Sequence, residues 1–250
     1  MAGRRLGFWR RLAVIVCKPP LYVVTRRTWS GMEHIPQSGG VIIVANHISH
    51  ADPLVIGHFV FDAGRWPSFL AKDGLFKLPV IGFGLKNAGQ IPVRRGSIDA
   101  VRALEAAIEG VKNGDSVIIY PEGTTTREPD LWPMRGRTGV ARLWLETRVP
   151  VVPVVMWGPE KIYNPLTKKL RLRFRTPVEV LAGEPIDLSK FDDAPPGNQT
   201  LNEISEHVML HLREMLIPLR ERDPASPWNA ADPVPPLWNG PIHHQRKDAS

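Results

Sequence analysis

The sequence predicts an α/β fold with a mixed, largely parallel sheet flanked by helices, and three observations support this. Short runs rich in β-branched residues, such as Val41–Ala45, Val117–Tyr120 and Val151–Trp157, are typical of buried strands. Apolar residues at helical spacing between residues 97 and 114 separate two of these runs. With 250 residues, 43% of them hydrophobic, the chain can bury a sizeable core. Strands that alternate with helices indicate an α/β domain.

The individual elements follow from periodicity and from turn residues. Pro79, Gly82 and Gly84 interrupt the apolar stretch Leu75–Lys86, so we expect a short helix and turns there. The remaining expected elements, in chain order, are a strand Val41–Ala45, a helix Pro53–Phe61, strands Ser68–Lys72 and Gln90–Val93, a helix capped by Ser97 and stopped by Gly114, a strand Val117–Tyr120, a helix Gly139–Arg148, a strand Val151–Trp157, one or two strands within Leu170–Val180, and an amphipathic helix Leu201–Arg220.

The net charge of +7 is concentrated at the N-terminus. Residues 1–32 contain seven Lys or Arg residues and no acidic residue, so residues 33–250 are formally neutral. Aromatic and aliphatic residues lie between these charges, which favours an interfacial helix on an anionic membrane. An ordinary helix packed on the core is one alternative. A secretory signal peptide is another, but the apolar run Leu12–Cys17 is short and lacks a small-residue cleavage site.

Three regions are therefore expected: a membrane-surface segment 1–32, a globular domain 33–222 and a Pro-rich tail 223–250. The tail has six prolines and no periodicity, which predicts disorder, although Trp228 and Trp238 offer two apolar groups for packing. The single cysteine, Cys17, excludes an intramolecular disulfide and suits a reducing compartment. No run of 18 apolar residues is present that would span a bilayer. The neutral body has no extended basic groove, which argues against a nucleic-acid partner.

Three loops that follow predicted strands carry unusual sets of polar residues. They are His47 to Asp52, Arg94-Arg95, and residues 121–127. Ligands of α/β sheets gather where strands end and loops begin, so these loops are candidates to converge on one site.

His47 and Asp52 together have the chemistry of a general base. Imidazole takes up a proton near neutral pH, and a nearby carboxylate can fix its tautomer. Five positions apart, the two residues would point in different directions on a regular helix, so they must meet across a loop or a helix's first turn. Pro53 favours such a turn, because proline suits an early helical position.

Four segments in this order closely resemble the motif blocks of the glycerolipid acyltransferases, specifically the 1-acylglycerol-3-phosphate acyltransferase (PlsC-like) family. The resemblance covers about residues 30–190, and the ordered set is far more specific than any one member. The four segments are Asn46-His47-x4-Asp52, Gly89-Gln90-Ile91-Pro92-Val93-Arg94, Tyr120-Pro121-Glu122-Gly123-Thr124, and Val149-Pro150-Val151-Val152-Pro153-Val154. Ala71–Pro79 and Arg137–Arg142 resemble two further family segments.

The resemblance implies the glycerolipid acyltransferase fold and an enzyme that moves a fatty acyl group from acyl-CoA or acyl-carrier protein to a lysophospholipid hydroxyl. The leading acceptor is 1-acylglycerol-3-phosphate, which would give phosphatidate. His47 would be the base and Asp52 its orienting carboxylate. No cofactor or metal is expected, because the leaving thiol departs readily. The implied location is the cytoplasmic side of the membrane, as a peripheral or monotopic protein.

By the same resemblance Arg94 and the basic residues of the third loop bind the acceptor's phosphate. Glu122 either accepts a substrate hydrogen bond or braces the loop, and Gly123 and Thr124 fit a tight turn with exposed backbone donors. The family's third block usually reads Glu-Gly-Thr-Arg, whereas the fourth position here is Thr125. The missing arginine would be replaced by Arg127, or else by Arg95 or Arg137.

Other functions remain as alternatives at this stage. Within the enzyme class, another lysophospholipid or dihydroxyacetone phosphate would be the acceptor. A catalytically silent lipid-binding protein and a metal-dependent hydrolase built on His47, His50 and Asp52 represent other classes, although no further ligand cluster completes a metal site. Trp132, Trp144 and Trp157 are expected to pack in the core or line an acyl groove. His207 and His211 lack the glutamate of a zinc protease motif and are expected on a helix surface.

Overall fold

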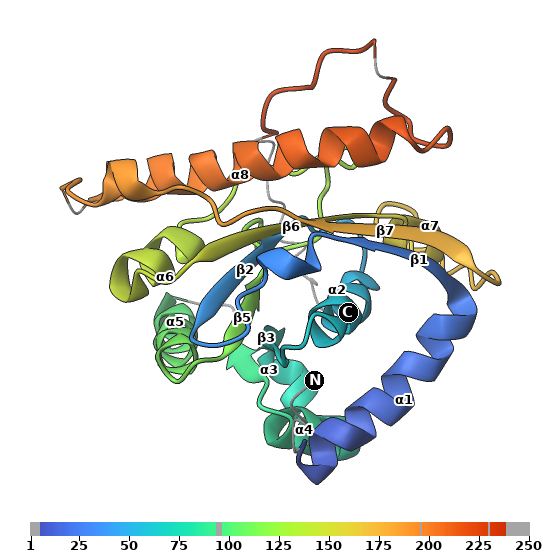
Figure 1. Ribbon diagram of the computed structural model, residues 1–250, viewed down its shortest axis with the longest axis horizontal. Helices are drawn as coiled ribbons and strands as arrows, with labels where there is room; N and C mark the ends of the chain where they lie inside the picture. The colour runs from blue at the N-terminus through green and yellow to red at the C-terminus, as the bar shows by residue number, and fades with distance from the viewer. Residues whose placement is uncertain (1–5, 94–96, 196, 230, 239–250) are drawn as a thin grey trace, which may run out of the picture.

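The computed structural model describes residues 6–93, 97–195, 197–229 and 231–238 of the chain. In this part of the chain the strands form one seven-stranded sheet in the order β1-β7-β6-β2-β5-β3-β4, with helices on both sides (Figure 1). The elements are α1 (Phe8–Val24), β1 (Thr25–Ser30), η1 (Met32–His34), β2 (Val41–Ala45), α2 (Asp52–Asp62), β3 (Pro67–Lys72), α3 (Asp73–Phe76), α4 (Pro79–Asn87), β4 (Ile91–Val93), α5 (Ser97–Lys112), β5 (Ser116–Ile119), α6 (Gly139–Thr147), β6 (Val151–Trp157), α7 (Pro159–Ile162), β7 (Thr176–Ala182), η2 (Ser189–Phe191) and α8 (Asn198–Glu221).

The sheet is mixed and largely parallel, as the sequence predicts. Only β6 and β7 pair in antiparallel fashion among the described strands, with Val154 opposite Ala182. The other neighbouring pairs, including β2 with β5 and β2 with β6, run parallel. Every residue of β2 and of β6 is buried, because helices cover both faces of the sheet at its centre.

Alternate residues of the central strands enter two separate cores. Ile42 and Val44 of β2 face a core shared with α5, α6 and α8, whereas Val41, Ile43 and Ala45 face a core shared with α2. In Figure 1, α8 crosses one face of the sheet while α2 and α1 lie on the other. Because β2 lies between two parallel neighbours, the carboxyl ends of β2, β5 and β6 meet at one edge of the sheet.

Helix α8 is fixed to the sheet by a buried arginine. Arg220 is 1% exposed, and its guanidinium lies over the rings of Trp132, Trp157 and Trp228 at 4.1, 4.5 and 5.9 Å. It also donates to the carbonyl of Asp130 at 2.7 Å. Aromatic faces stabilise a cation that has lost its water, which lets this charge remain inside the core.

The structure bears on two further expectations from the sequence. Within Leu170–Val180 the only strand is β7, which begins at Thr176; Leu170 makes a single bridge to Tyr163, and residues 171–175 are exposed loop. Two residues of the expected tail contact the domain: Trp228 is buried against Trp132, and the carbonyl of Trp238 accepts the amide of Arg135 at 3.1 Å. Of the expected core tryptophans, Trp132, Trp144 and Trp157 all belong to the core under α8.

The N-terminal region contributes to the sheet as well as to a helix. β1 pairs with β7 along its whole length, so the sheet begins within residues 1–32, before the domain boundary expected at residue 33. Helix α1 contacts α2 through an ion pair between Lys18 and Asp62 at 2.7 Å, and Trp29 Nε1 donates to the same carboxylate at 3.2 Å. Partial burial acts to raise the pKa of Asp62, but hydrogen bonds from His58 at 3.2 Å, Lys18 and Trp29 outweigh it and hold the pKa well below its usual range.

Much of α1 nevertheless faces outward. Ile15 and Val16 are 68% and 60% exposed, and Leu21 is the buried residue of this helix. Throughout the described ranges, every helix is too short or too polar to cross a bilayer.

Candidate active site

The site begins where β2 ends, and Asn46 fixes that point. Its side-chain amide donates to the carbonyl of Met156 at 3.0 Å and accepts the Met156 amide at 2.9 Å. Asn46 is completely buried, so the two hydrogen bonds are shielded from water. The end of β2 is therefore tied to β6, and the loop that follows leaves the sheet from a fixed position.

His47 and Asp52 meet across this loop, as their spacing and Pro53 predict. His47 Nδ1 lies 2.8 Å from Asp52 Oδ2. The same oxygen accepts the amides of Ile48 and Ser49 at 2.7 and 2.8 Å, and Asp52 is completely buried at the start of α2. Because a carboxylate oxygen accepts hydrogen bonds, the proton of neutral His47 belongs on Nδ1, which leaves Nε2 as the basic nitrogen.

The electrostatics of Asp52 reflect this enclosure. Burial raises the pKa of Asp52 above its usual value, while the hydrogen bonds from His47, Ser49 and Ile48 oppose the rise.

The plane of the His47 ring is set by an aromatic neighbour. The ring stacks on Tyr120, with centroids 4.0 Å apart and an interplanar angle of 17°. Tyr120 directly follows β5, so this contact joins the loop after β2 to the loop after β5. Together with Asp52, Tyr120 restricts the imidazole to one orientation.

Glu122 braces the backbone from which His47 projects. It is 1% exposed, and its two carboxylate oxygens accept the amides of His47 at 3.2 Å and Met134 at 3.0 Å. Of the two roles expected for Glu122, this geometry supports the brace rather than a contact with substrate. Burial raises the pKa of Glu122 to about 8, although the two amide donors favour the charged form.

The third loop forms the expected tight turn. Gly123 has φ +70°, a conformation that favours glycine, and its amide donates to the Tyr120 carbonyl at 2.9 Å. Thr124 and Thr125 are partly exposed beside it, and Arg127 is exposed. Arg137 lies against Gly123, because a Cβ at Gly123 would come within 3.0 Å of the Arg137 side chain. Arg94 and Arg95 lie outside the described residues.

A second buried arginine holds this loop from α8. Arg213 is 3% exposed and donates to the Pro133 carbonyl at 3.0 Å, next to the Met134 amide that binds Glu122. A continuous path of contacts therefore runs from α8 through the loop to Glu122 and the His47 backbone. Because Arg213 follows Pro133 by 80 residues and carries no motif, sequence reasoning missed it. Asn46 and Tyr120 belong to the motif blocks, but the sequence does not indicate their contacts with Met156 and His47.

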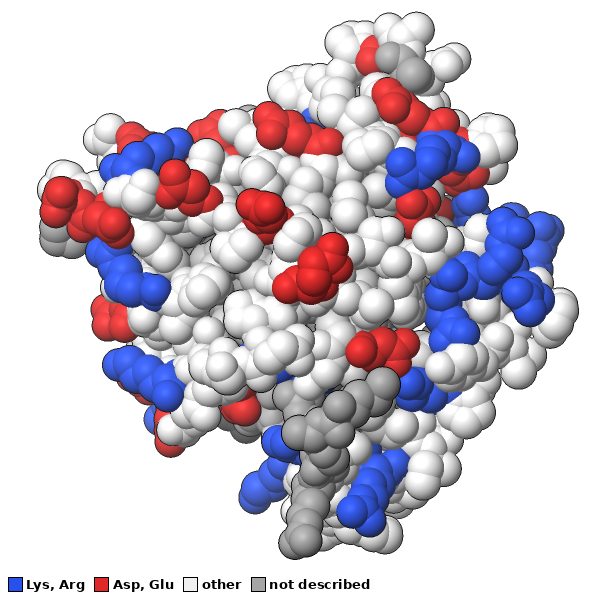
Figure 2. All heavy atoms as spheres, viewed as in Figure 1, with Lys and Arg blue, Asp and Glu red and all other residues white. Residues whose placement is uncertain are grey.

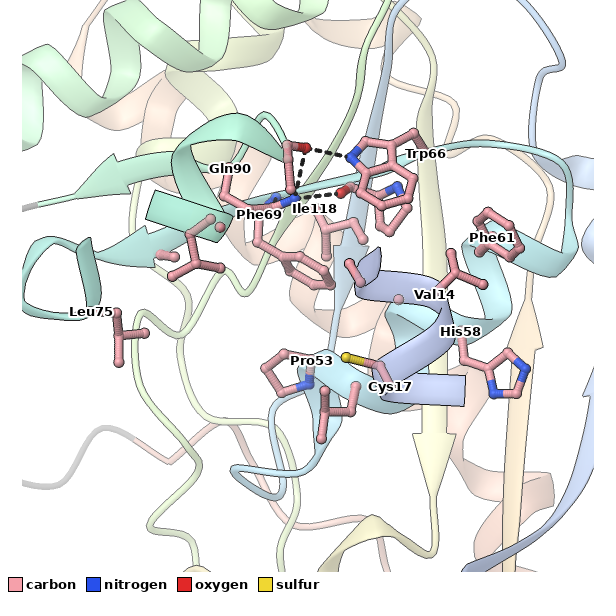
Figure 3. A pocket seen from close by; sticks show the side chains of 18 of the residues that line it. Val14, Cys17, Pro53, His58, Phe61, Trp66, Phe69, Leu75, Gln90 and Ile118 are labelled. Atoms are coloured by element: carbon pink, nitrogen blue, oxygen red, sulfur yellow. Dashed lines mark hydrogen bonds between the residues drawn. The ribbon is translucent and has the colours of Figure 1, made fainter. Parts of the chain in front are cut away.

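An apolar cavity of about 730 Å³ adjoins this site and has His47, Tyr120 and Gly123 among its lining residues. The cavity lies between α1, α2, α4 and β3 (Figure 3). In that view Val14 and Cys17 of α1, Phe61 of α2 and Phe69 of β3 point toward the same space. Its volume falls within the usual range for small-molecule pockets, about 300–1,000 Å³, and its walls suit a hydrocarbon chain.

Comparison with known proteins gives a consistent result. The model of the Acyltransferase family matches residues 26–157, which is more than half of the chain. A chloroplastic 1-acyl-sn-glycerol-3-phosphate acyltransferase of Brassica napus, BAT2, is 31% identical over 160 residues, covering 63% of this chain and 45% of that protein. The 1-acyl-sn-glycerol-3-phosphate acyltransferase of Borreliella burgdorferi is 33% identical over 135 residues, 54% of this chain and 52% of its own.

The chain thus spans about half the length of these curated relatives. Among solved structures, the 1-acyl-sn-glycerophosphate (LPA) acyltransferase PlsC from Thermotoga maritima superposes with a TM-score of 0.59 at 25% identity. That match covers 83% of this chain and 80% of the other.

The raised pKa of Glu122 predicts a pH-dependent stability. The folded protein holds this proton up to about pH 8, whereas the unfolded chain releases it near the ordinary value of 4.5. The contribution of Glu122 to the free energy of unfolding is therefore complete below pH 4.5 and is lost as the pH rises toward 8. Glutamine does not titrate, so the Glu122→Gln variant lacks this loss. We expect the free energy of unfolding of the variant minus that of the wild type to increase by roughly 1–3 kcal/mol as the pH rises from 5 to 8.

Urea unfolding of both proteins at several pH values measures this difference. Two stability curves that stay parallel from pH 5 to 8 would show that Glu122 has an ordinary pKa.

Proposed function

The chain belongs to the acyltransferase family, and from that premise we propose that it transfers a fatty acyl group from a thioester to the free hydroxyl of a lysophospholipid. The donor is acyl-CoA or acyl-carrier protein, and the leading acceptor is 1-acylglycerol-3-phosphate. The observation that supports this most directly is the His47–Asp52 pair at 2.8 Å beside an apolar cavity of about 730 Å³.

In the proposed reaction His47 Nε2 removes the proton from the acceptor hydroxyl as its oxygen attacks the thioester carbonyl. Asp52 Oδ2 holds the Nδ1 proton and stabilises the imidazolium that forms. When the tetrahedral intermediate collapses, the C–S bond breaks and the imidazolium returns its proton to the departing sulfur. The thiolate is a good leaving group, so the step requires no metal and no covalent acyl-enzyme.

The cavity would take the acyl chain, because its walls offer apolar contacts and exclude water from the reacting carbonyl. For the acceptor's phosphate we propose Arg94 and Arg127, with Gly123 and Thr124 supplying backbone donors in the turn. Arg137 is the alternative cation, since its side chain lies against Gly123. The exposed apolar residues of α1 would hold the protein at the surface of an anionic membrane, on the cytoplasmic side, where the lipid substrates are.

We predict that His47→Ala and Asp52→Asn each lower the rate of acyl transfer by about 100-fold or more, because one removes the base and the other disturbs its tautomer. Release of free CoA from an acyl-CoA, with detergent-dispersed lysophosphatidate as acceptor, measures the rate. His50→Ala is the matched control, since His50 lies three residues from His47 in the same loop; it should stay within about threefold of the wild type.

A panel of acceptors completes this experiment. Faster release with another lysophospholipid or with dihydroxyacetone phosphate would reassign the acceptor. If no acceptor supports release of CoA, the proposed acyl transfer is wrong. If His47→Ala leaves the rate of release unchanged while lipid binding persists, the protein is better described as a lipid-binding protein.

A second prediction concerns the acyl chain. Gly57 of α2 lines the cavity, and a Cβ at this position would contact the Phe69 ring at 3.4 Å. Gly57→Leu should fill part of the cavity and lower kcat/KM for a long-chain donor by roughly tenfold, while a medium-chain donor is affected much less. Gly57→Ala is the smaller control and should have little effect. Equal losses with both donors would show that the chain binds elsewhere.

A further inference from the structure

A basic, apolar loop leads from α7 to β7 and has no role in the site described above. We call residues 164–175 the basic loop. Three of its apolar side chains are exposed to solvent: Leu170 is 61%, Leu172 67% and Phe174 76% exposed. Large apolar groups at such exposure, at every second position of one short segment, are unusual unless they meet a partner.

The charges of the basic loop are all positive. Lys168, Lys169, Arg171, Arg173 and Arg175 are exposed, and the sequence has no Asp or Glu between residues 161 and 178. Figure 2 shows Lys and Arg side chains gathered at the right of the view, over the junction between α1 and the start of β7. Besides the basic residues among the first 32, the chain therefore has a second cluster of Lys and Arg residues, in the basic loop.

The backbone of the basic loop is held in place although its side chains are exposed. The Asn164 amide donates to the Lys169 carbonyl at 3.1 Å, and the Arg171 amide donates to the Ile162 carbonyl at 2.7 Å. At its end, the Arg175 amide donates to the Val23 carbonyl of α1 at 3.1 Å. Val23 is itself 57% exposed, so the apolar surface continues from the loop onto α1.

The start of the basic loop adjoins the loop that carries His47. Ser49 Oγ donates to the Tyr163 carbonyl at 2.8 Å, and the rings of His50 and Tyr163 lie 5.2 Å apart. A surface that the basic loop binds is therefore brought close to the candidate active site.

From these observations we propose that the basic loop is a docking surface for an anionic lipid bilayer, continuous with the outer face of α1. Leu170, Leu172 and Phe174 insert among the headgroups, and the interleaved Lys and Arg side chains pair with lipid phosphates. An anionic bilayer matches both features at once, because it offers negative charge at the surface and hydrocarbon beneath. A nucleic acid would match the charge but leave the apolar side chains without a partner.

This inference rests on the membrane partner proposed above, but its test needs no acyl transfer. The wild type should sediment with vesicles of phosphatidylglycerol and phosphatidylcholine, and less with phosphatidylcholine alone. The triple variant Lys169→Gln, Arg171→Gln, Arg173→Gln should lower binding to the anionic vesicles by at least tenfold, since each cation near such a surface contributes several-fold in affinity. The double variant Leu172→Ser, Phe174→Ser should also lower it.

The matched control removes three exposed cations by Arg102→Gln, Lys112→Gln and Arg142→Gln on α5 and α6, which lie across the molecule from the junction of α1 and β7 (Figure 1). It should bind anionic vesicles within about twofold of the wild type, and so should His47→Ala, which separates docking from catalysis. Equal losses in the test and control triples would overturn the proposal, as would an unchanged Leu172→Ser, Phe174→Ser protein. Binding of a DNA duplex as tight as that of anionic vesicles would also overturn it.

If the triple variant loses vesicle binding but no variant or wild type shows acyl transfer, the docking surface stands and the proposed enzyme fails. If the wild type transfers acyl groups but does not bind anionic vesicles, the proposed docking surface is wrong and the proposed enzyme activity stands.

Discussion

One buried oxygen, Oδ2 of Asp52, organises the candidate site. It accepts hydrogen bonds from the His47 ring and from the amides of Ile48 and Ser49, all within 2.8 Å. A carboxylate inside a protein is costly unless several donors satisfy it, so the loop must adopt the one path that delivers all three. The tautomer of His47 and the path of the loop into α2 follow from this requirement, and the stacked Tyr120 ring sets the plane of the imidazole. The end of β2 can meet it because Asn46 fixes that end to β6.

Glu122 and α8 support the His47 loop in the same way, through buried hydrogen bonds. Glu122 is almost as completely buried as Asp52 and accepts the amides of His47 and Met134, and burial raises its pKa to about 8. One of these donors, Met134, belongs to a loop held by Arg213. The helix farthest from the site in sequence thereby supports the residue that positions the base. A buried polar network of this kind stabilises one arrangement only while every member keeps its partner.

Much of the fold was predictable because local patterns determine it. The apolar run Val41–Ala45 forms β2 with the expected bounds. The pairing of His47 with Asp52 was indicated by the ordered family motif blocks, while their spacing and Pro53 indicated only that they would meet across a loop or a first helical turn. Of the one or two strands expected within Leu170–Val180, the structure has one, β7 from Thr176. The residues before it form a loop, since nothing covers the apolar side chains of Leu170, Leu172 and Phe174 among the described residues. The roles of Glu122 and Arg213 were beyond prediction, since they depend on contacts between segments brought together by tertiary packing.

The tautomer of His47 is the most direct test of this account. Nitrogen NMR of the protein labelled at histidine distinguishes a protonated ring nitrogen from a bare one, and Asp52→Asn identifies the His47 signals. We predict that neutral His47 carries its proton on Nδ1 and leaves Nε2 bare, as the 2.8 Å contact with Asp52 requires. A proton found on Nε2, or an averaged signal typical of a freely exposed histidine, would contradict it.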